Sequence, residues 1–168
     1  IQLFIKMGTC YGLYKNHQLR NTDIDVPFFN FNGEEHYVKV VDVYDGDTCQ
    51  VMMKFNNNYY KFKIRALGYD SPEMKPPKNA TRRLKIKEKA IDARNYLISR
   101  ITDLDNPLAL TKEQIKIKMK QNKKIIKLKC YDYDKYGRIL GEFIVNGKNI
   151  NHEMINKKYG YPYDGGTK

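Results

Sequence analysis

Residues 37–67 read YVKVVDVYDGDTCQVMMKFNNNYYKFKIRAL and contain three segments in which apolar and polar side chains alternate. Tyr37–Tyr44, Thr48–Phe55 and Tyr59–Leu67 are rich in β-branched and aromatic residues, a composition typical of strands. An Asp-Gly pair and an asparagine-rich run separate them as turns. Because short turns join antiparallel neighbours, the three segments predict a meander.

Downstream of residue 67 the pattern becomes helical and then returns to strands. Apolar residues recur at helical spacing from Thr81 to Ile101, and Thr111 is placed to cap a short basic helix. Lys123–Tyr131 and Arg138–Val145 alternate as strands around a DKYG turn, and a last helix is expected from about Ile150 to Lys158. The order β-β-β-α-insert-β-β-α predicts an α+β fold, mainly β, built on a five-stranded OB-fold Greek-key barrel with flanking helices.

Length and composition fit one domain with a basic surface. The chain has 168 residues, with 31 Lys and Arg against 19 Asp and Glu and a formal net charge of +12. This excess favours a polyanionic partner, above all nucleic acid, although a solvated basic surface also explains it. We expect no membrane partner, because no apolar run is long enough to span a bilayer. The three cysteines form no CxxC pair, which argues against a zinc site.

The first 35 residues show no clear period and are interpreted as an N-terminal extension with a strand near Phe28–Phe31. Residues 1–10 do not make a convincing signal peptide, because no small-residue cleavage site follows their short apolar run. An odd number of cysteines argues against a disulfide framework, so an intracellular location is favoured. Nothing in the sequence indicates a stable protein partner, and a monomer is expected.

Acidic residues gather at two turns of the predicted meander. Asp45 and Asp47 flank a glycine, and Asp70 and Glu73 flank a Ser-Pro pair. A hairpin brings the start of its first strand near the end of its second, and carboxylates meeting there suit a hard cation such as Ca²⁺ or Mg²⁺. Ordinary turn chemistry favours the same residue types, so spacing alone leaves both interpretations open.

Two arginines stand out in a chain in which lysine is far commoner. Arg65 lies in an alternating segment five residues before Asp70, and Arg138 begins the segment after the DKYG turn. A guanidinium group holds phosphate oxygens in a bidentate manner, which an ammonium group cannot do. A salt bridge, for instance from Arg65 to Asp70, explains that arginine equally well.

Three motifs together carry a family resemblance: Asp45-Gly46-Asp47-Thr48, Arg65-x4-Asp70-Ser71-Pro72-Glu73 and Asp134-Lys135-Tyr136-Gly137-Arg138. In order and spacing they resemble the staphylococcal nuclease (thermonuclease) family, and the viral and eukaryotic-type members look closest. The resemblance runs from about Tyr37 to Tyr161. It implies an SNase-like OB-fold nuclease domain at 36–163, with an insertion at 103–122 and a tail at 164–168.

The resemblance also implies a calcium site. Asp47 and Asp70 match the family's two carboxylate ligands, and Ser71 occupies the position whose backbone carbonyl binds the ion. Asp45 matches an acid that lies just outside the ligand shell. The implied cofactor is therefore Ca²⁺.

The implied activity is that of an endonuclease, a hydrolase that cleaves DNA and RNA with little sequence specificity at the 5′ P–O bond to leave 3′-phosphate ends. Arg65 and Arg138 match the pair that grips the scissile phosphate, and Glu73 matches the proposed general base. Residues matching the nucleotide pocket, or candidates for it, are Lys135, Tyr136, Tyr161 and Tyr163.

Two other classes of function compete with an enzyme. A catalytically inactive OB-fold module would bind single-stranded nucleic acid through a basic groove and aromatic stacking. A basic membrane-surface protein would need an amphipathic basic helix with a strong apolar face. The chain keeps Asp47, Asp70, Glu73, Arg65 and Arg138 together, whereas degenerate relatives usually lose the acids or the arginines, so the enzyme is favoured.

Overall fold

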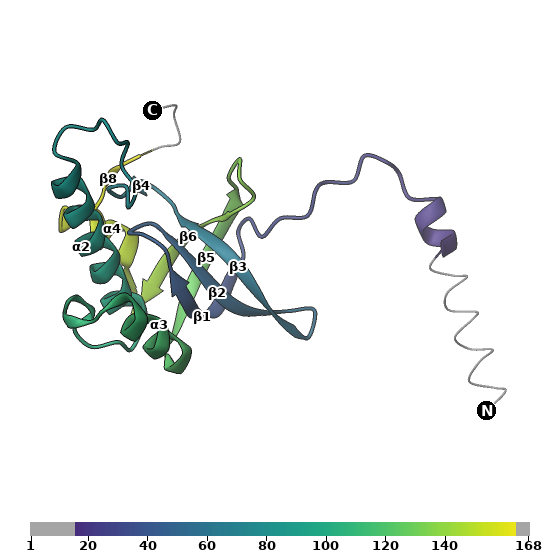
Figure 1. Cartoon of the computed structure of the whole chain (residues 1–168). Helices are drawn as coiled ribbons and strands as arrows, with labels where there is room; N and C mark the ends of the chain where they lie inside the picture. The colour runs from purple at the N-terminus through teal and green to yellow at the C-terminus, as the bar shows by residue number, and fades with distance from the viewer. Residues whose placement is uncertain (1–15, 164–168) are drawn as a thin grey trace.

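The structure is a computed structural model and describes residues 16–163 (Figure 1). A barrel of strands carries helices on one side, and an N-terminal arm leads away from the barrel on the other. The elements in chain order are β1 (Glu35–Val43), β2 (Thr48–Phe55), β3 (Asn58–Ala66), β4 (Tyr69–Asp70), α2 (Arg83–Ile101), η1 (Pro107–Ala109), α3 (Lys112–Gln121), β5 (Ile125–Tyr133), β6 (Ile139–Val145), β7 (Lys148–Asn149), α4 (Ile150–Asn156) and β8 (Tyr161–Pro162).

Five strands close into a mixed barrel. Their order is β3-β2-β1-β5-β6, and a parallel pairing of β3 with β6 joins the two ends of the sheet. That pairing covers only Ile64–Ala66 of β3, opposite Ile139–Gly141. A five-stranded barrel that contains a meander and a helix after the third strand is the OB-type architecture predicted from the sequence.

The β2–β3 hairpin follows directly from its sequence. Phe55 pairs with Asn58 across a two-residue turn, in which Asn56 has φ 46 and Asn57 has φ 66. Two positive φ angles define the type I′ turn, whose twist matches the strands that it joins. Asparagine tolerates this left-handed conformation better than most residues, so the asparagine run sets the hairpin register.

The core fills the barrel and the space beneath α2 and α4. Val38, Val51, Ile64 and Leu128 point inward from four strands and are fully or almost fully buried. α2 contacts α4, β1 and β6, and α4 contacts β6. The apolar face of α2 predicted from helical spacing is the face that is buried.

Most predicted boundaries agree with the structure, and β2 agrees at both ends. The long helix begins at Arg83 instead of Thr81, because Arg82 has φ 60 and cannot extend the helix. The strand expected near Phe28–Phe31 is absent from the described structure. Phe31 is instead a buried anchor, with its ring centroid 5.3 Å from that of Phe62 and 5.4 Å from that of Phe55.

A buried asparagine joins the segment between α2 and β5 to the barrel, beside the apolar residues Leu104, Ile115 and Met119 that the segment adds to the core. Asn122 donates from Nδ2 to the carbonyl of Val40 on β1 (2.8 Å) and accepts from the amides of Asp103 and Lys124. Within the segment, Thr111 and Gln114 form a capping box at the start of α3, as the sequence predicts for this threonine. Among the helices of residues 16–163, none is both long enough and apolar enough to cross a membrane.

Candidate active site

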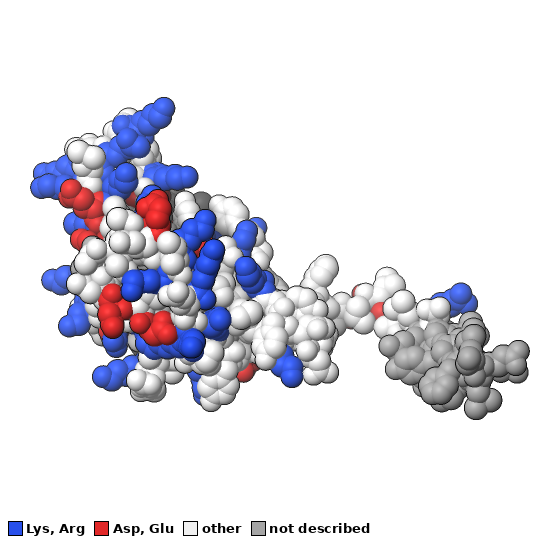
Figure 2. Space-filling view, turned by 60° about the horizontal axis from the view of Figure 1, so that its bottom comes forward, with Lys and Arg blue, Asp and Glu red and all other residues white. Residues whose placement is uncertain are grey.

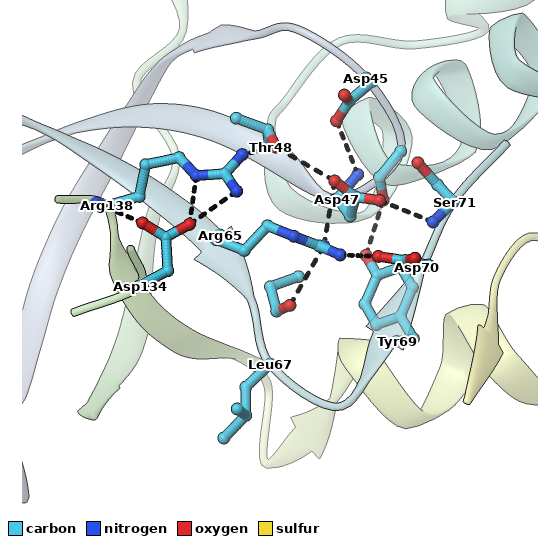
Figure 3. Close-up of polar contacts among 12 residues, drawn as sticks. Asp45, Asp47, Thr48, Arg65, Leu67, Tyr69, Asp70, Ser71, Asp134 and Arg138 are labelled. Atoms are coloured by element: carbon cyan, nitrogen blue, oxygen red, sulfur yellow. Dashed lines mark hydrogen bonds and ion pairs between the residues drawn. The ribbon is translucent and has the colours of Figure 1, made fainter. Parts of the chain in front are cut away.

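The candidate site lies where β2 begins and β3 ends, beside β4 (Figure 3). The hairpin register places Thr48 opposite Arg65, so the residue before Thr48 is brought to the side chain of Arg65. A short loop then returns the chain to Asp70. The two acidic turns of the sequence therefore meet across one hairpin, as its spacing suggests.

Arg65 joins the two aspartates in a buried cluster. Its NH1 atom lies 3.0 Å from Oδ1 of Asp47, and its NH2 atom donates to Oδ1 of Asp70. The other oxygen of Asp47 accepts the backbone amide of Ser71 at 2.6 Å, across 24 residues of sequence. All four residues are less than a tenth exposed. Removing one member of such a cluster leaves a buried charge without its partner, which is strongly destabilising.

Arg138 approaches the same cluster from the β5–β6 turn. Its Nε and NH2 atoms both lie 2.6 Å from Oδ2 of Asp134, and its NH1 atom donates to the hydroxyl of Thr48 at 3.2 Å. The Thr48 hydroxyl in turn donates to Oδ1 of Asp47 at 3.0 Å. One continuous chain of hydrogen bonds and ion pairs therefore connects both arginines with both aspartates.

Backbone packing fixes the turn that carries Asp47. The hydroxyl of the buried Tyr69 donates to the carbonyl of Gly46 at 2.6 Å. Burial and then the negative charge of Asp47 raise the pKa of Tyr69 well above its usual value, so the phenol stays protonated and able to donate. A Cβ at Gly46 would lie 2.7 Å from Cβ of Ser71, closer than such atoms approach. Glycine is therefore required here for the close approach of the two acidic turns.

Asp45 is a neighbour of this cluster and accepts the amide of Asp47 on its own Oδ1 at 3.1 Å. Burial, and after it the charge of Asp47, raises the pKa of Asp45 to about 6. Burial disfavours the charged carboxylate, and the neighbouring negative charge of Asp47 acts in the same direction.

The residues fit a hard divalent cation in the chemistry of their donors. Asp47 and Asp70 supply buried carboxylate oxygens, the ligand type that Ca²⁺ prefers, and one guanidinium balances only one of their two charges. In the described part of the chain, no three acidic, histidine or cysteine side chains converge closely enough to hold a metal. A bound ion would therefore share Asp47 and Asp70 with Arg65.

The remaining predicted site residues surround this cluster at the surface. Tyr136 is 71% exposed, and its ring centroid lies 5.4 Å from Cζ of Arg138 and 5.2 Å from Nζ of Lys135. Tyr161 pairs with Asp70 between β8 and β4, and the amide of Tyr163 donates to the carbonyl of Gly68 at 3.1 Å.

Glu73 is exposed and lines a surface cavity of about 650 Å³ next to the cluster. Its walls come from the proline-rich loop after β4, from α2 and from the segment that leads into β8. The lining residues are Pro72, Glu73, Pro76, Pro77, Ile86, Lys89, Lys158, Tyr159, Gly160 and Tyr161. Figure 2 shows many Lys and Arg side chains on the face in view, as the net charge predicts.

Sequence reasoning assigned no role to Asp134, Thr48 or Tyr69, which hold the functional side chains in place. The role of Asp134 could have been predicted from the sequence, because an acidic residue four positions before an arginine, across a tight turn, can form an ion pair with it. Thr48 and Tyr69 gave no such signal, since their contacts depend on the register of the hairpin and on the path of the loop into β4.

A family model described as staphylococcal nuclease homologue matches residues 63–163, more than half of the chain. The matched region includes Arg65, Asp70 and Arg138, whereas Asp45 and Asp47 precede it. A search of the curated proteins finds no match to this sequence.

Proposed function

The chain belongs to the staphylococcal nuclease family, and on that premise we propose that it is a Ca²⁺-dependent phosphodiesterase that hydrolyses DNA, RNA or both. As an endonuclease it would show little sequence specificity and cut the 5′ P–O bond, leaving 3′-phosphate ends. Family membership supports the nuclease class, and the metal and the position of the cut are part of the proposal.

One observation carries the proposal. The chain of contacts Asp70–Arg65–Asp47–Thr48–Arg138 joins two carboxylates and two guanidinium groups from segments far apart in the sequence. Buried arginine–aspartate clusters contribute little net stability. A contribution to stability therefore does not by itself explain why this cluster is present. Guanidinium groups bind phosphate oxygens, and carboxylates bind divalent cations. The cluster therefore carries the groups that would bind both.

Each residue has a role in this proposal. Arg65 and Arg138 donate N–H groups to the scissile phosphate and hold it more tightly as it becomes pentacoordinate and gains negative charge. Glu73 accepts a proton from the attacking water, directly or through another water. Asp134 and Thr48 orient the guanidinium of Arg138, so they are positioning residues.

Asp47 and Asp70 would hold the cation, with the carbonyl of Ser71 as a further ligand and Asp45 outside them. When bound, Ca²⁺ supplies Lewis-acid polarisation of a phosphate oxygen. The surrounding lysines and the pocket candidates Lys135, Tyr136, Tyr161 and Tyr163 would bind neighbouring phosphates and sugars of the substrate.

A cleavage assay on single-stranded DNA, double-stranded DNA and RNA tests the proposal, with Ca²⁺, with Mg²⁺ and with EDTA. We expect digestion in Ca²⁺ that EDTA abolishes. Arg138→Ala should cost about 2.7–4 kcal/mol of transition-state stabilisation, the usual loss when one donor to a developing anion is removed. Arg20→Ala is the matched control, because it removes an exposed arginine far from the site. Full activity in Arg138→Ala would refute the proposed clamp.

The competing function is a catalytically inactive module that binds single-stranded nucleic acid. Salt-sensitive binding of the same substrates, with no digestion in any metal, would establish it. The retained arginines and acids argue against this outcome, because binding alone requires no pair of buried aspartates.

A further inference from the structure

The N-terminal arm, residues 22–29, exposes apolar side chains and leads away from the barrel (Figure 1). Ile24 is 92% exposed and Phe28 is 98% exposed, with Val26 between them at 60%. Figure 2 shows the arm as a largely uncharged projection. An exposed apolar segment of this kind marks a contact surface more often than a free one.

Two phenylalanines fasten the base of the arm to the hairpin. The ring of Phe29 lies 5.2 Å from that of Phe55 at the end of β2, and the buried Phe31 packs against the same ring. The arm therefore leaves the barrel beside the tip of the β2–β3 hairpin, with its position there fixed.

The arm sequence Asp23-Ile24-Asp25-Val26 alternates acidic and apolar residues. A period of two is the signature of a strand with one apolar face and one polar face. In the part of the chain that the structure describes, this segment pairs with no strand. The sequence thus specifies strand geometry that the single chain does not use.

The outer edge of β3 is a matching acceptor. β3 pairs with β6 only from Ile64 onward, so among the described residues no strand covers the outer edge of Asn58–Lys63. The two-residue turn makes Phe55 and Asn58 a hydrogen-bonded pair, after which the pattern alternates along the hairpin. The backbone groups of Tyr59, Lys61 and Lys63 therefore point outward, available to another strand.

One antiparallel register of the arm on the β3 edge pairs opposite charges on one face and apolar side chains on the other. With Asp25 opposite Lys61, Asp23 falls opposite Lys63, and both pairs join opposite charges. The alternate positions then place Val26 opposite Tyr60 and Ile24 opposite Phe62. These two aromatic side chains lie on the inward face of β3, because their partners Met53 and Val51 on β2 are buried.

Pro27 fits the end of this register. It falls opposite Tyr59, next to the hairpin tip, where the added strand would stop. Because the backbone of Tyr59 points outward, the position opposite needs an N–H that proline lacks, so the added strand ends at Val26. Pairs of opposite charge and of aromatic with β-branched residues are the contacts that stabilise neighbouring strands.

We propose that the arm of one copy adds to the β3 edge of a second copy as an antiparallel strand, and that the exchange is mutual. The arm leads away from its own barrel, so the acceptor is the edge of another chain. The register brings the arm's Phe28 to the partner's hairpin tip, while Phe29 stays on its own hairpin tip. The two tips therefore meet at a twofold axis, as a self-complementary interface requires. This dimer is proposed in place of the monomer expected from the sequence, and it does not depend on the proposed nuclease activity.

A charge-exchange experiment on the full chain tests the register. One variant carries Asp23→Lys and Asp25→Lys, the other Lys61→Glu and Lys63→Glu. Light scattering coupled to size exclusion should show a wild-type dimer whose association weakens at least about tenfold in either variant, equivalent to about 1.4 kcal/mol. An equimolar mixture of the two variants should form a heterodimer, because each arm then meets an edge of opposite charge.

Three results would overturn the proposal. The first is a wild type that stays monomeric at every concentration, and the second is a dimer indifferent to both charge reversals, which would place the interface elsewhere. The third is a monomeric wild type whose Lys61 and Lys63 amides are protected from hydrogen exchange, with that protection lost in either variant, which would mean that the arm folds onto its own edge.

Discussion

Asp134 is predicted to orient the guanidinium of Arg138 toward the substrate phosphate. Replacement of Asp134 by asparagine tests this prediction. Its carboxylate accepts the amides of Tyr136 and Arg138 on Oδ1, each at 2.9 Å, and two guanidinium nitrogens of Arg138 on Oδ2. Asparagine keeps one oxygen for the backbone amides. Its NH₂ group then faces the guanidinium, so the charged pair is lost.

These contacts set the size of the expected change in the free energy of unfolding. The Asp134 side chain is 13% exposed and that of Arg138 is 24% exposed, so water screens the pair only partly. A hydrogen bond to a charged group contributes about 1.5–3 kcal/mol, and we expect Asp134→Asn to lower the free energy of unfolding by that amount. Asp134→Ala also removes the acceptor of both turn amides and should therefore cost more than Asp134→Asn.

Kinetics distinguish two roles for Asp134. It either orients Arg138 toward the phosphate or competes with the phosphate for Arg138. If Asp134 orients Arg138 toward the phosphate, Asp134→Asn lowers kcat about tenfold for each 1.4 kcal/mol of lost transition-state stabilisation, with little change in KM. Urea unfolding and steady-state cleavage of a short oligonucleotide measure the two effects, and Asp134→Glu is the conservative control. A rise in kcat, or a lower KM with kcat unchanged, would refute the reasoning, because it would mean that Asp134 competes with the phosphate for Arg138.

Stability should also depend on pH through this residue. Burial raises the pKa of Asp134, but hydrogen bonds from the amide and side chain of Arg138 and from the amide of Tyr136 outweigh burial and lower it overall. A lowered pKa stabilises the folded state above the unfolded value of about 3.9, and this stability is lost as pH falls through the folded value. The difference in unfolding free energy between wild type and Asp134→Asn should therefore shrink as the solution is acidified through that window, and a constant difference would contradict it.

Four further predictions concern packing, a buried hydrogen bond and buried charge. Gly46→Ala places a methyl group 2.7 Å from Cβ of Ser71 and 2.9 Å from that of Ala93, and should lower both cleavage and the unfolding free energy, the latter by about 1–3 kcal/mol; a silent substitution would show that the turns can separate. Asn122→Ala leaves the Val40 carbonyl without its donor and should lose about 1–3 kcal/mol in urea unfolding, while the cleavage rate per folded molecule is unchanged. Phe31→Ala should lose about 3–5 kcal/mol, measured by thermal unfolding, and a smaller loss would mean that Phe29 replaces it. Arg65→Ala should destabilise more than Arg138→Ala, because it removes the guanidinium that bridges two buried aspartates, and equal melting temperatures would contradict this.

The fold was largely predictable because its local signals agree with one another. Alternation, the Asn56-Asn57 turn and the Thr111 cap each point to the elements that the structure contains. Three short strands, β4, β7 and β8, were not predicted, since two residues are too few for a periodic pattern. The β3–β6 closure also lies beyond sequence reasoning, because it joins segments more than 70 residues apart through only three pairs.

The residues of the Arg65 cluster could be named from the sequence as candidates, but their geometry could not be predicted. Spacing suggested that Asp47 and Asp70 lie close together and that Arg65 reaches Asp70; the Arg65–Asp70 contact forms, and the two aspartates are joined through Arg65. The sequence did not reveal that one guanidinium joins both acids, or that Thr48 links Arg138 to them. These contacts depend on side-chain direction at the end of a hairpin, which a one-dimensional pattern does not encode.

The pairing of Asp70 with Tyr161 has a consequence for biosynthesis. As the chain emerges from the ribosome, Asp47, Arg65 and Asp70 appear early, whereas the strand that holds Asp70 and the turn that carries Arg138 appear much later. The barrel closes only when β6 is present, and β4 gains its partner only when β8 is present. While residues 71–137 are being made, the nascent chain therefore carries the acidic half of the site without its second arginine, and the site is complete only after β8 has emerged.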